Sequence, residues 1–346
     1  MRVVTVVGNR PQFVKAAAVS RLLRDQHEEV LIHTGQHYDD ALSAVFFAEL
    51  GIPRPDRELR LGTGTNAQQT ARMLDALAPL LAEEAPDLVL VYGDTNSTLA
   101  GGLAAVQDQI PVVHVEAGMR SFDRRMPEEV NRVLTDHLSS LLLCSSQVAV
   151  DNLAREGVTA SVELVGDVMV DIAQLVQPRA REQAGRSGHV LVTAHRAGNV
   201  DDPERLERLV ALLEAVPGDV VMPLHPRTQA RLEETGLLPR LAAAVELLPP
   251  VGYLEFTALL VGARAMLTDS GGVQKEAYLA GIPCVTLRDT TEWVETVEAG
   301  WNVLVDLDTD AALAALERRP PEARPELYGD GRAGERVVEA LATFRS

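Results

Sequence analysis

The stretch Leu88–Gly101 reads LVLVYGDTNSTLAG, and its pattern recurs through the chain. Its first five residues are all apolar or aromatic and do not alternate with polar residues. Such continuous apolarity is typical of a strand that is buried on both faces of a parallel sheet. The polar residues Gly93–Ser97 would then lie at the carboxyl end of this strand, where a helix begins.

Further runs of this kind occur in the first half of the chain, at Arg2–Val7, Glu29–His33, Pro111–Val115 and Leu141–Cys144. Helical patterns separate the runs, for example over Thr70–Ala82 and Glu128–Leu138. The alternation of strand and helix predicts an α/β fold with a doubly wound parallel sheet.

The second half of the chain repeats this alternation of strands and helices. We expect its strands at Val190–Thr193, Asp219–Leu224, Val245–Leu248, Ala265–Thr268, Pro283–Leu287 and Asn302–Val305. Two such sheets in series imply two doubly wound domains facing a central cleft. We expect an N-terminal domain of residues 1–167 and 331–346 and a C-terminal domain of residues 168–330.

The segment Gly166–Asp171 is expected to be the hinge between these domains. A polar connector is expected over Gln177–Gly188, within the second domain. The last helical pattern, Gly334–Phe344, is amphipathic and is expected to pack back across the hinge.

Length and charge limit the possible classes of protein. A chain of 346 residues exceeds what one hydrophobic core usually supports, so two domains of about 150 residues are expected. The net charge is −18 and no block of Lys or Arg occurs, which argues against nucleic acid or a membrane surface as a partner. A small anion is still a possible ligand, because a few arginines in one cleft outweigh distant charges screened within about 10 Å.

The cysteine content points to a reducing compartment. The only cysteines, Cys144 and Cys284, lie in the apolar runs LLLCSS and IPCVTL, so we expect both to be small core hydrophobes. The apolar stretch among the first residues is too short for a signal peptide. No apolar run approaches the roughly 18 residues of a membrane span. These features predict a cytoplasmic protein.

Carboxylates follow neighbouring strands in the first half of the chain. Asp94 follows the strand Leu88–Tyr92, Glu116 follows Pro111–Val115, and Glu128 begins the next helix. Asp94 and Glu128, taken singly, could be helix-capping carboxylates, which stabilise a helix by roughly 1 kcal/mol. Three carboxylates at one edge of a sheet favour proton transfer instead, because crowding of like charges would keep at least one of them protonated near neutral pH.

Basic residues follow other strands. Arg10 and Lys15 follow the first strand, in the sequence GNRPQFVK. In the second half, His195 and Arg196 follow one strand, and His225 precedes Arg227 after another. Arginine offers a charge-assisted fork for phosphate, and histidine can donate or stack, so we expect an anionic ligand at these strand ends.

The turn Thr268–Glu276 reads TDSGGVQKE and lies between a strand and a helix. Ser270, Gly271 and Gly272 would expose backbone N–H groups at the helix start, which is a site for anions. Glu276 could accept hydrogen bonds from ribose hydroxyls. We therefore expect a nucleotide diphosphate here, although a tight strand-to-helix turn would account for one of the glycines.

Other familiar cofactor and metal motifs are missing. Gly62-Thr63-Gly64 lacks a third glycine at the dinucleotide-binding spacing, and no Walker P-loop occurs. The histidines lack the spacing of a zinc site. We therefore expect neither a cofactor nor a metal.

Taken together, the motifs resemble those of the non-hydrolysing UDP-N-acetylglucosamine 2-epimerases. The resemblance runs from Gly8 to about Val305 and includes GNRPQFVK, TGQH, YGDTNSTLAG, HVEAGMRSF, MPEEVNRVLTDH, TAHR, TDSGGVQKEA and GIPCVTLRDTTE. It implies two Rossmann-like domains of the GT-B type, a cytoplasmic homodimer, and a UDP-sugar as the substrate.

The resemblance also implies roles for individual residues. Asp94, Glu116 and Glu128 would be the acid/base carboxylates, carried by the N-terminal domain, with His195 also at the catalytic centre. The residues implied to bind the UDP-sugar, mainly in the C-terminal domain, are Arg10, Lys15, His195, His225, Ser270, Gly271, Gly272 and Glu276. The implied reaction converts UDP-GlcNAc and UDP-ManNAc into each other by elimination of UDP and its readdition to 2-acetamidoglucal.

Some residues depart from the family pattern. Gln12 stands where many members have Glu, Gly198 stands where a Glu is common, and Trp293 follows Thr291-Glu292 where Arg-Pro is expected. The stretches PQF, TEWVE and AGWNVLV are similar to the branch that epimerises UDP-2,3-diacetamido-2,3-dideoxyglucuronic acid, which is therefore the alternative substrate. The allosteric UDP-N-acetylglucosamine site of some members is half matched, with Gln36 and His37 present but no basic residue in the loop Leu61–Asn66.

Three rival functions are compatible with the same fold. A GT-B glycosyltransferase would not need carboxylates that bracket C2 of the sugar. A catalytically silent sugar-nucleotide sensor should have lost Asp94 or Glu116, yet both are present. A hydrolysing epimerase, which releases UDP and free N-acetylmannosamine, is the third alternative.

Overall fold

The structure is a computed structural model that describes residues 1–36 and 53–344. The chain divides into two compact units. Unit 1 comprises Met1–Gln174 and Glu326–Ser346, and unit 2 comprises Leu175–Pro325. The borders at 174/175 and 325/326 therefore differ by a few residues from the expected 167/168 and 330/331.

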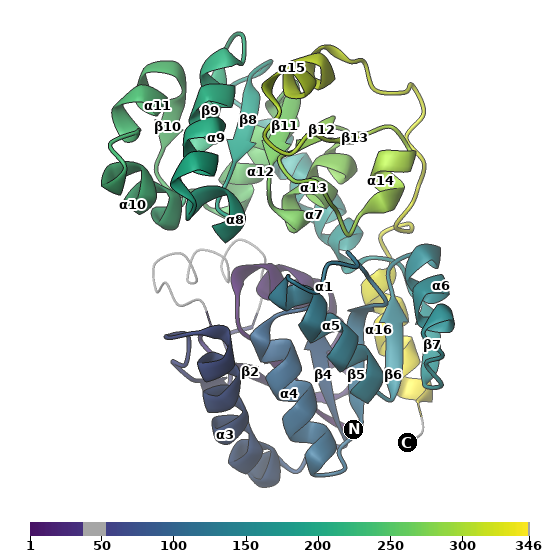
Figure 1. Cartoon of the computed structure of the whole chain (residues 1–346). Coiled ribbons are helices and arrows are strands. Elements are labelled where there is room, and N and C mark those ends of the chain that lie inside the picture. Colours follow the sequence, from purple (N-terminus) through teal and green to yellow (C-terminus); the bar gives the residue numbers. More distant parts are fainter. Residues whose placement is uncertain (37–52, 345–346) are drawn as a thin grey trace. The chain divides into compact units, whose positions relative to one another are not determined.

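Unit 1 is built on a parallel sheet with the strand order β3-β2-β1-β4-β5-β6-β7 (Figure 1). The described strands are β1 (Arg2–Val7), β2 (Glu28–His33), β3 (Arg57–Glu58), β4 (Leu88–Tyr92), β5 (Val112–Ala117), β6 (Leu141–Cys144) and β7 (Ser161–Leu164). The described helices that follow or join them are α1 (Arg10–Gln26), α3 (Asn66–Glu84), α4 (Asn96–Gln107), α5 (Pro127–Leu138), α6 (Gln147–Arg155) and α16 (Ala333–Thr343). Helix α7 (Val168–Gln183) begins in unit 1 and ends in unit 2. The chain order of the strands reverses between β1 and β4, which is the switch point where ligands bind in doubly wound sheets.

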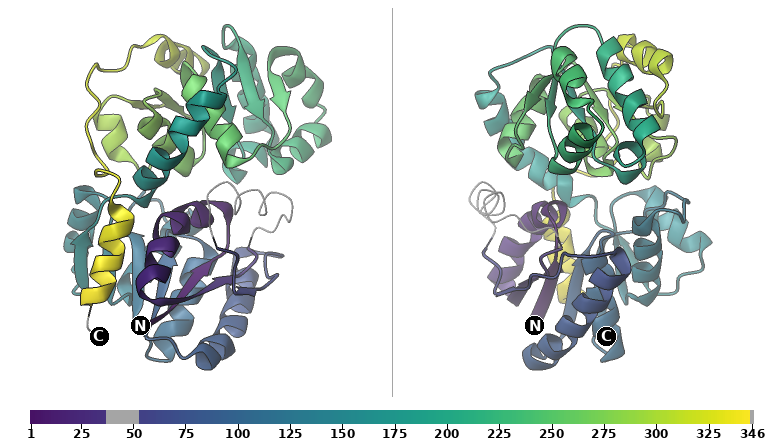
Figure 2. Two further views of the ribbon diagram at one scale, coloured as in Figure 1. Left: turned by 180° about the vertical axis from the view of Figure 1, so that it is seen from behind. Right: turned by 60° about the vertical axis from the view of Figure 1, so that its left-hand side comes forward.

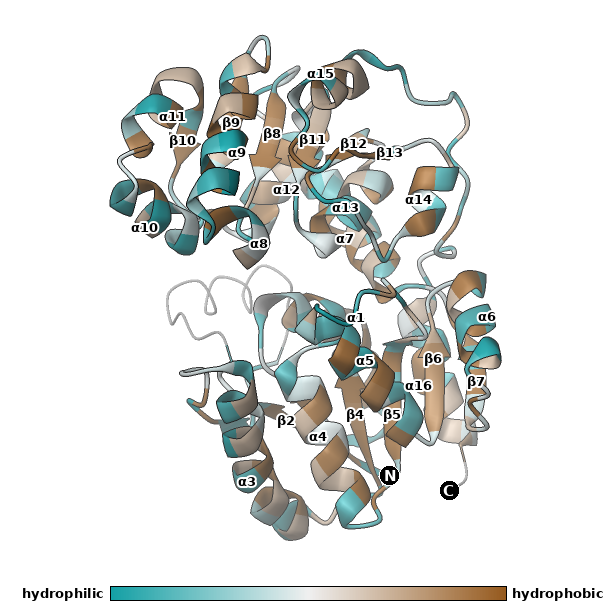
Figure 3. Ribbon diagram, viewed as in Figure 1, coloured by the Kyte–Doolittle hydropathy of each residue, from teal (hydrophilic) through white to brown (hydrophobic). Residues whose placement is uncertain are grey.

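The central strands of unit 1 are buried because their side chains are apolar on both faces. All five residues of β4 are buried, and the hydropathy colouring shows β4, β5 and β6 as mostly hydrophobic (Figure 3). The helices cover both faces of the sheet, as the two strand-helix-strand halves require. The predicted apolar strands of this half are thereby confirmed, with ends that shift by one or two residues.

Unit 2 repeats this design with the strand order β10-β9-β8-β11-β12-β13. The strands are β8 (Val190–Thr193), β9 (Val220–Pro223), β10 (Glu246–Leu248), β11 (Ala265–Thr268), β12 (Cys284–Thr286) and β13 (Asn302–Leu304). The helices are α8 (Ala197–Val200), α9 (Pro203–Ala215), α10 (Pro226–Glu234), α11 (Leu238–Ala244), α12 (Tyr253–Gly262), α13 (Gly271–Ala280), α14 (Val294–Glu298) and α15 (Thr309–Glu317). The switch point of this sheet lies between β8 and β11.

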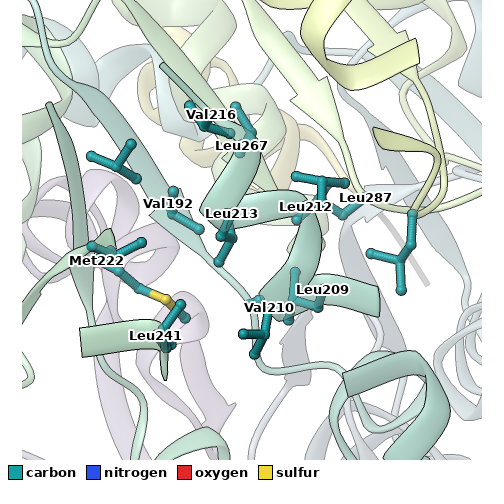
Figure 4. Close-up of a cluster of buried hydrophobic side chains, with 14 of the residues drawn as sticks. Val192, Leu209, Val210, Leu212, Leu213, Val216, Met222, Leu241, Leu267 and Leu287 are labelled. Atoms are coloured by element: carbon teal, nitrogen blue, oxygen red, sulfur yellow. The ribbon is translucent and has the colours of Figure 1, made fainter. Parts of the chain in front are cut away.

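One core of unit 2 forms where α9 packs on the sheet. Leu209, Leu212 and Leu213 of α9 meet Val192 of β8 and Leu267 of β11, and all five are almost fully buried (Figure 4). At roughly 25 cal/mol per Å² of apolar surface removed from water, such clusters are the main source of each unit's stability. This core fixes the positions of the turns that follow β8 and β11.

Three parts of the sequence interpretation need correction. The residues Gln177–Gln183 belong to α7 and are not a polar connector, because the buried residues Val168, Ile172, Val176 and Ala180 recur at helical spacing. The strands β3 and β7 were missed, since both are short and largely exposed. Glu116 does not follow β5 but lies within it, at an irregularity in the pairing with β6.

The last helix of the described chain belongs to unit 1. Helix α16 packs beside α1, as the view from behind also shows (Figure 2). Its first turn is capped by Asp171, whose carboxylate accepts hydrogen bonds from the backbone N–H groups of Ala333 and Gly334 at 3.1 and 2.8 Å. Asp171 lies in the expected hinge segment, which the structure assigns to unit 1.

Both cysteines are free and buried, as predicted. Burial raises the pKa of the Cys144 thiol and of the Cys284 thiol to about 12. Within residues 1–36 and 53–344, no helix has the length and apolarity to cross a membrane.

Candidate active site

The turn after β4 carries Asp94 at the carboxyl edge of the sheet in unit 1. The carboxylate of Asp94 forms an ion pair with Arg132 of α5, a side chain that is only 2% exposed. Arg132 also contacts Glu129 at 3.0 Å, so one buried guanidinium joins two carboxylates. Asn131 donates to the backbone oxygen of Asp94 at 3.1 Å, which fixes the turn as well as the side chain.

Glu116 lies on the neighbouring strand in an unusual backbone conformation. Strands β4 and β5 are paired in parallel, with Tyr92 beside Val115, so Asp94 and Glu116 leave the sheet at the same edge. The pairing of β5 with β6 is irregular between Val115 and Ala117, and Glu116 has φ = +71°. A left-handed residue other than glycine costs roughly 1–3 kcal/mol and tends to persist where the surrounding structure serves a function.

Lys15 balances the charge of Glu116. The ammonium group of Lys15, on α1, forms an ion pair with Glu116, and the two side chains are 13% and 5% exposed. The sequence analysis expected three crowded carboxylates whose mutual repulsion would keep one protonated. The structure instead places a cation against Asp94 and another against Glu116, so like-charge crowding does not describe this edge of the sheet.

The two glutamates at the start of α5 have different environments. Glu129 is buried, and it accepts hydrogen bonds from the backbone N–H groups of Ser121 and Phe122 at 2.9 and 3.0 Å. Glu128, the residue chosen from the sequence, is half-buried in the first turn of the same helix. Glu129 therefore anchors two groups, the loop before α5 and the guanidinium of Arg132. Glu128 is more accessible than Glu129.

The loop after β1 is held by Gln12. The side-chain oxygen of Gln12 accepts from the Gly8 N–H at 2.7 Å, and its NH₂ group donates to the Tyr92 carbonyl at 2.7 Å and to Thr98 at 2.8 Å. Gln12 thus ties the ends of β1 and β4 together at the switch point. Arg10 begins α1 at this loop, and its side chain lies outside the described residues, as does His37.

Gln36 has a structural partner. Its side-chain oxygen accepts from the backbone N–H of Ser97 at 3.1 Å and from the Ser97 hydroxyl at 2.8 Å. This satisfies a free N–H group in the first turn of α4. The allosteric role that the resemblance suggested for Gln36 stays a prediction.

In unit 2, Asp269 organises the turn that carries His195. Its buried carboxylate accepts from the backbone N–H of His195 at 3.1 Å and from that of Arg196 at 2.9 Å. Asn199 adds a hydrogen bond of 3.3 Å to the same carboxylate and donates to Leu287 at 2.9 Å. Asp269 follows β11 and His195 follows β8, so the carboxylate links both sides of the switch point.

His195 lies against His225. The two ring centroids are 5.1 Å apart with an interplanar angle of 33°. The Nδ1 atom of His225 accepts from the Arg227 N–H at 3.2 Å, so His225 also caps α10. Burial lowers the pKa of His195, and the charges of Arg196 and Arg227 lower it further against the opposing charge of Asp269. His195 is therefore a neutral ring at pH 7, with one donor and one acceptor.

The start of α13 has no cap from the side chain of its own N-cap residue. Ser270 is the N-cap, and its hydroxyl makes no capping hydrogen bond. The N-terminus of a helix without a side-chain cap presents free N–H groups and a positive dipole end, which together bind anions. Glu276 lies half-buried further along the same helix.

Trp293 replaces the expected arginine and packs on α13. Its ring N–H donates to the Gly271 carbonyl at 2.8 Å, and the ammonium group of Lys275 lies 4.1 Å from its ring centroid. Lys275 is 1% exposed, so this cation–π contact is desolvated and correspondingly strong. The Trp293 substitution therefore makes a new contact with the helix that is expected to bind the diphosphate.

The candidate residues fall into one group in each unit. Unit 1 brings together Asp94, Glu116, Lys15 and Glu128 at one edge of its sheet, and unit 2 brings together His195, His225, Ser270 and Gly271 at another. Sequence reasoning missed Arg132, Glu129 and Asp269. The sequence did indicate Arg132, because it lies four residues after Glu128 on the same helix, and side chains at this spacing share a face.

Two doubly wound parallel-sheet units place the chain in the GT-B class of folds, as predicted. The family model for UDP-N-acetylglucosamine 2-epimerase matches residues 20–342. The chain belongs to the UDP-N-acetylglucosamine 2-epimerase family, and the resemblance found in its sequence is confirmed. It is an enzyme of the isomerase class, a UDP-sugar 2-epimerase.

Individual relatives cover nearly the whole chain. The chain is 47% identical to UDP-2,3-diacetamido-2,3-dideoxy-D-glucuronate 2-epimerase of Pseudomonas aeruginosa, over 99% of each protein. It is 41% identical to UDP-N-acetylglucosamine 2-epimerase of Methanocaldococcus jannaschii, again over 99% of each. The crystal structure of the M. jannaschii UDP-GlcNAc 2-epimerase in complex with UDP-GlcNAc and UDP matches with a TM-score of 0.93 and 39% identity, covering 99% of this chain and 100% of that one.

Proposed function

We propose that the chain converts UDP-GlcNAc and UDP-ManNAc into each other by elimination and readdition of UDP. The observation that carries this proposal is the pair of charge-balanced carboxylates, Asp94 and Glu116, at neighbouring strand ends of unit 1. Proton removal and return at C2 need two proton-transfer groups, one for each face of the sugar ring.

The proposed reaction begins with proton abstraction. A carboxylate takes the proton from C2, the C2–H electrons form a C1=C2 double bond, and the C1–O bond breaks. The diphosphate oxygen of UDP takes up the electron pair, which leaves 2-acetamidoglucal. The reverse steps, with a proton delivered to the opposite face of C2, give the epimer. Protons and electrons balance without a cofactor.

Asp94, Glu116 and Glu128 are the proposed acid and base groups. Arg132 and Lys15 hold Asp94 and Glu116 in place through ion pairs, so neither carboxylate has to be ordered when the substrate binds. Fixing reacting groups beforehand is a large source of rate, because orientational entropy is not lost during the reaction. Asp94 and Glu128 are half-buried and Glu116 is buried, so Asp94 and Glu128 are better placed to exchange a bound proton with solvent.

Unit 2 is the proposed site for UDP. The uncapped N-terminus of α13, with Ser270, Gly271 and Gly272, would bind the diphosphate, and Glu276 would accept hydrogen bonds from the ribose. The neutral ring of His195 would donate one hydrogen bond to the leaving diphosphate, with His225 supporting it. Arg10 and Lys15 of unit 1 stay proposed substrate-binding residues.

A second substrate is favoured by a specific observation. The P. aeruginosa relative, at 47% identity, bears the name of a diacetamido-uronate epimerase, and Trp293 and its neighbours resemble that branch. UDP-2,3-diacetamido-2,3-dideoxyglucuronic acid undergoes the same chemistry at C2, and differs by an amide at C3 and a carboxylate at C6. It is therefore the alternative substrate of the same site.

Incubating the purified chain separately with the two UDP-sugars, and following inversion at C2 by proton NMR, tests the proposal. The larger kcat/KM identifies the substrate. Release of free UDP without an epimeric UDP-sugar would point to the hydrolysing reaction. Turnover only with an added sugar acceptor would point to a glycosyltransferase.

A further inference from the structure

We propose that His114 and Asp136 form a buried positioning pair that sets the spacing of Asp94 and Glu116, with the ring of His114 protonated on both nitrogens. The inference rests on the proposed function, because it assigns these two carboxylates to proton transfer. Neither His114 nor Asp136 is itself placed against the substrate.

Asp136 holds β5 on both sides of Glu116. One of its carboxylate oxygens accepts from Nδ1 of His114 at 2.7 Å, two residues before Glu116. Its other oxygen accepts from the Gly118 N–H at 3.1 Å, two residues after Glu116. The left-handed backbone of Glu116 is thus bracketed by two hydrogen bonds to one side chain of α5.

His114 extends this link to the turn of Asp94. Its Nε2 atom donates to the Gly93 carbonyl at 2.7 Å, and Gly93 is the residue before Asp94. Both His114 and Asp136 are fully buried, so water does not compete for these contacts. A single chain of hydrogen bonds therefore runs from the bulge of Glu116 through Asp136 and His114 to the turn of Asp94.

The partners of His114 determine the protons on its ring. The Gly93 carbonyl can only accept. Burial alone would raise the pKa of Asp136, but its hydrogen bonds and charge interactions with His114 and Arg120 bring that pKa below the ordinary value. A charged carboxylate can also only accept, so both ring nitrogens must carry a proton. Arg120 contacts Asp136 at 2.7 Å and Glu156 at 2.7 Å. The two carboxylates of Asp136 and Glu156 thus balance the positive charges of Arg120 and of the protonated His114 ring.

This arrangement explains how Glu116 keeps a strained backbone. Small displacements of a reacting group lower the rate steeply, while ground-state binding at another site is unaffected. A defect in the pair should therefore lower kcat and leave UDP affinity close to native, because most of the proposed UDP contacts lie in unit 2.

The first test measures the ring of His114 directly. In protein with ¹⁵N-labelled histidine at pH 7.5, both nitrogens of His114 should show the chemical shifts of a protonated imidazole, with the signals assigned by their loss in His114→Gln. Replacement of Asp136 by Asn should abolish this signature. One unprotonated ring nitrogen in the native protein would overturn the charge state proposed here, whether or not the protein epimerises a sugar.

The second test is kinetic. We expect Asp136→Asn and His114→Gln to lower kcat by about 100-fold, with unchanged UDP affinity by calorimetry. The matched control is Glu29→Gln, another buried carboxylate of unit 1, which accepts from Thr5 at 2.7 Å and pairs with Arg24 at 2.8 Å near the amino end of β2. The control should lose thermal stability and keep its kcat at a temperature where it is folded.

Native kcat in folded Asp136→Asn protein, or an equal loss of kcat in Glu29→Gln, would overturn the positioning role. Absence of epimerisation by the native protein would instead refute the proposed function, and the ring measurement would still decide the state of the pair.

Discussion

An oxygen of Glu292 lies 1.9 Å from the point where a β-carbon on Gly271 would be. The carboxylate of Glu292 is 5% exposed and contacts Arg288 at 3.0 Å, so the chain itself requires a glycine at position 271. The next residue differs, since no atom of the described chain lies within 4 Å of a β-carbon on Gly272. The described chain thus leaves room for a side chain at position 272, where the proposed diphosphate site lies.

These neighbours give a matched test of the UDP site. Gly272→Ala should keep or raise the stability of the protein, because alanine is the better helix former by up to about 1 kcal/mol. It should weaken UDP binding by about tenfold or more, or about 1.4 kcal/mol, because the methyl group would occupy the place of the diphosphate. Gly271→Ala should lose both stability and binding. Native UDP affinity of Gly272→Ala by calorimetry would refute the assignment of α13.

Amide replacement separates catalysis from helix stabilisation. Asp94→Asn, Glu116→Gln and Glu128→Gln should each lower kcat by about 100-fold to 10,000-fold, because the amide cannot exchange a proton. UDP affinity should stay close to native in all three variants. The measurement is steady-state kinetics together with calorimetry.

A matched control exists for Glu128. Glu128 and Glu204 both follow a proline at the first position of a helix, α5 and α9 respectively. If Glu128 only balances the helix dipole, Glu128→Gln and Glu204→Gln should behave alike, with a small loss of stability and native turnover. Such a result would remove Glu128 from the proposed mechanism.

Gln12 should not tolerate the glutamate that is common in the family. Its NH₂ group donates to the Tyr92 carbonyl, and a carboxylate would instead place an acceptor against that oxygen. We expect Gln12→Glu to lower the free energy of unfolding by roughly 1–3 kcal/mol, measured by urea denaturation at pH 7.5. The loss should shrink in acid, since a protonated Glu can donate. A loss that does not change with pH would contradict this account.

His189 and His195 should each contribute a loss of stability in mild acid. Burial lowers the pKa of His189 and of His195 below the ordinary value of about 6.5. As the pH falls, the unfolded chain therefore binds protons at these two rings before the folded chain does, and their contribution to stability falls below about pH 6.5. Urea denaturation between pH 8 and pH 5.5 measures this dependence.

His189→Gln should flatten the fall in stability, with the native protein as the reference. An equal slope in native protein and in His189→Gln would show that this buried ring does not contribute.

The sequence predicted the repeated strands and most candidate side chains, because continuous apolar runs and polar strand ends are local patterns. It could not predict the left-handed backbone of Glu116 or its pairing with Lys15, since these depend on residues far apart in the chain. The choice of Glu128 over Glu129 rested on its place at the start of the helix and then on the family resemblance. Their difference in burial depends on how α5 packs, which adjacent positions in a sequence do not reveal. The short strand β3 has no apolar run, so its pairing with β2 could not be predicted from the sequence either.

In the proposed mechanism, a carboxylate removes the proton from C2, and a carboxylate that exchanges protons with solvent returns one to C2. The most direct measurement follows the reaction in heavy water with the preferred UDP-sugar. We predict deuterium at C2 of both epimers, because the abstracted proton exchanges before readdition of UDP. Epimerisation with no deuterium at C2, together with native activity in the amide variants of Asp94, Glu116 and Glu128, would contradict the elimination mechanism.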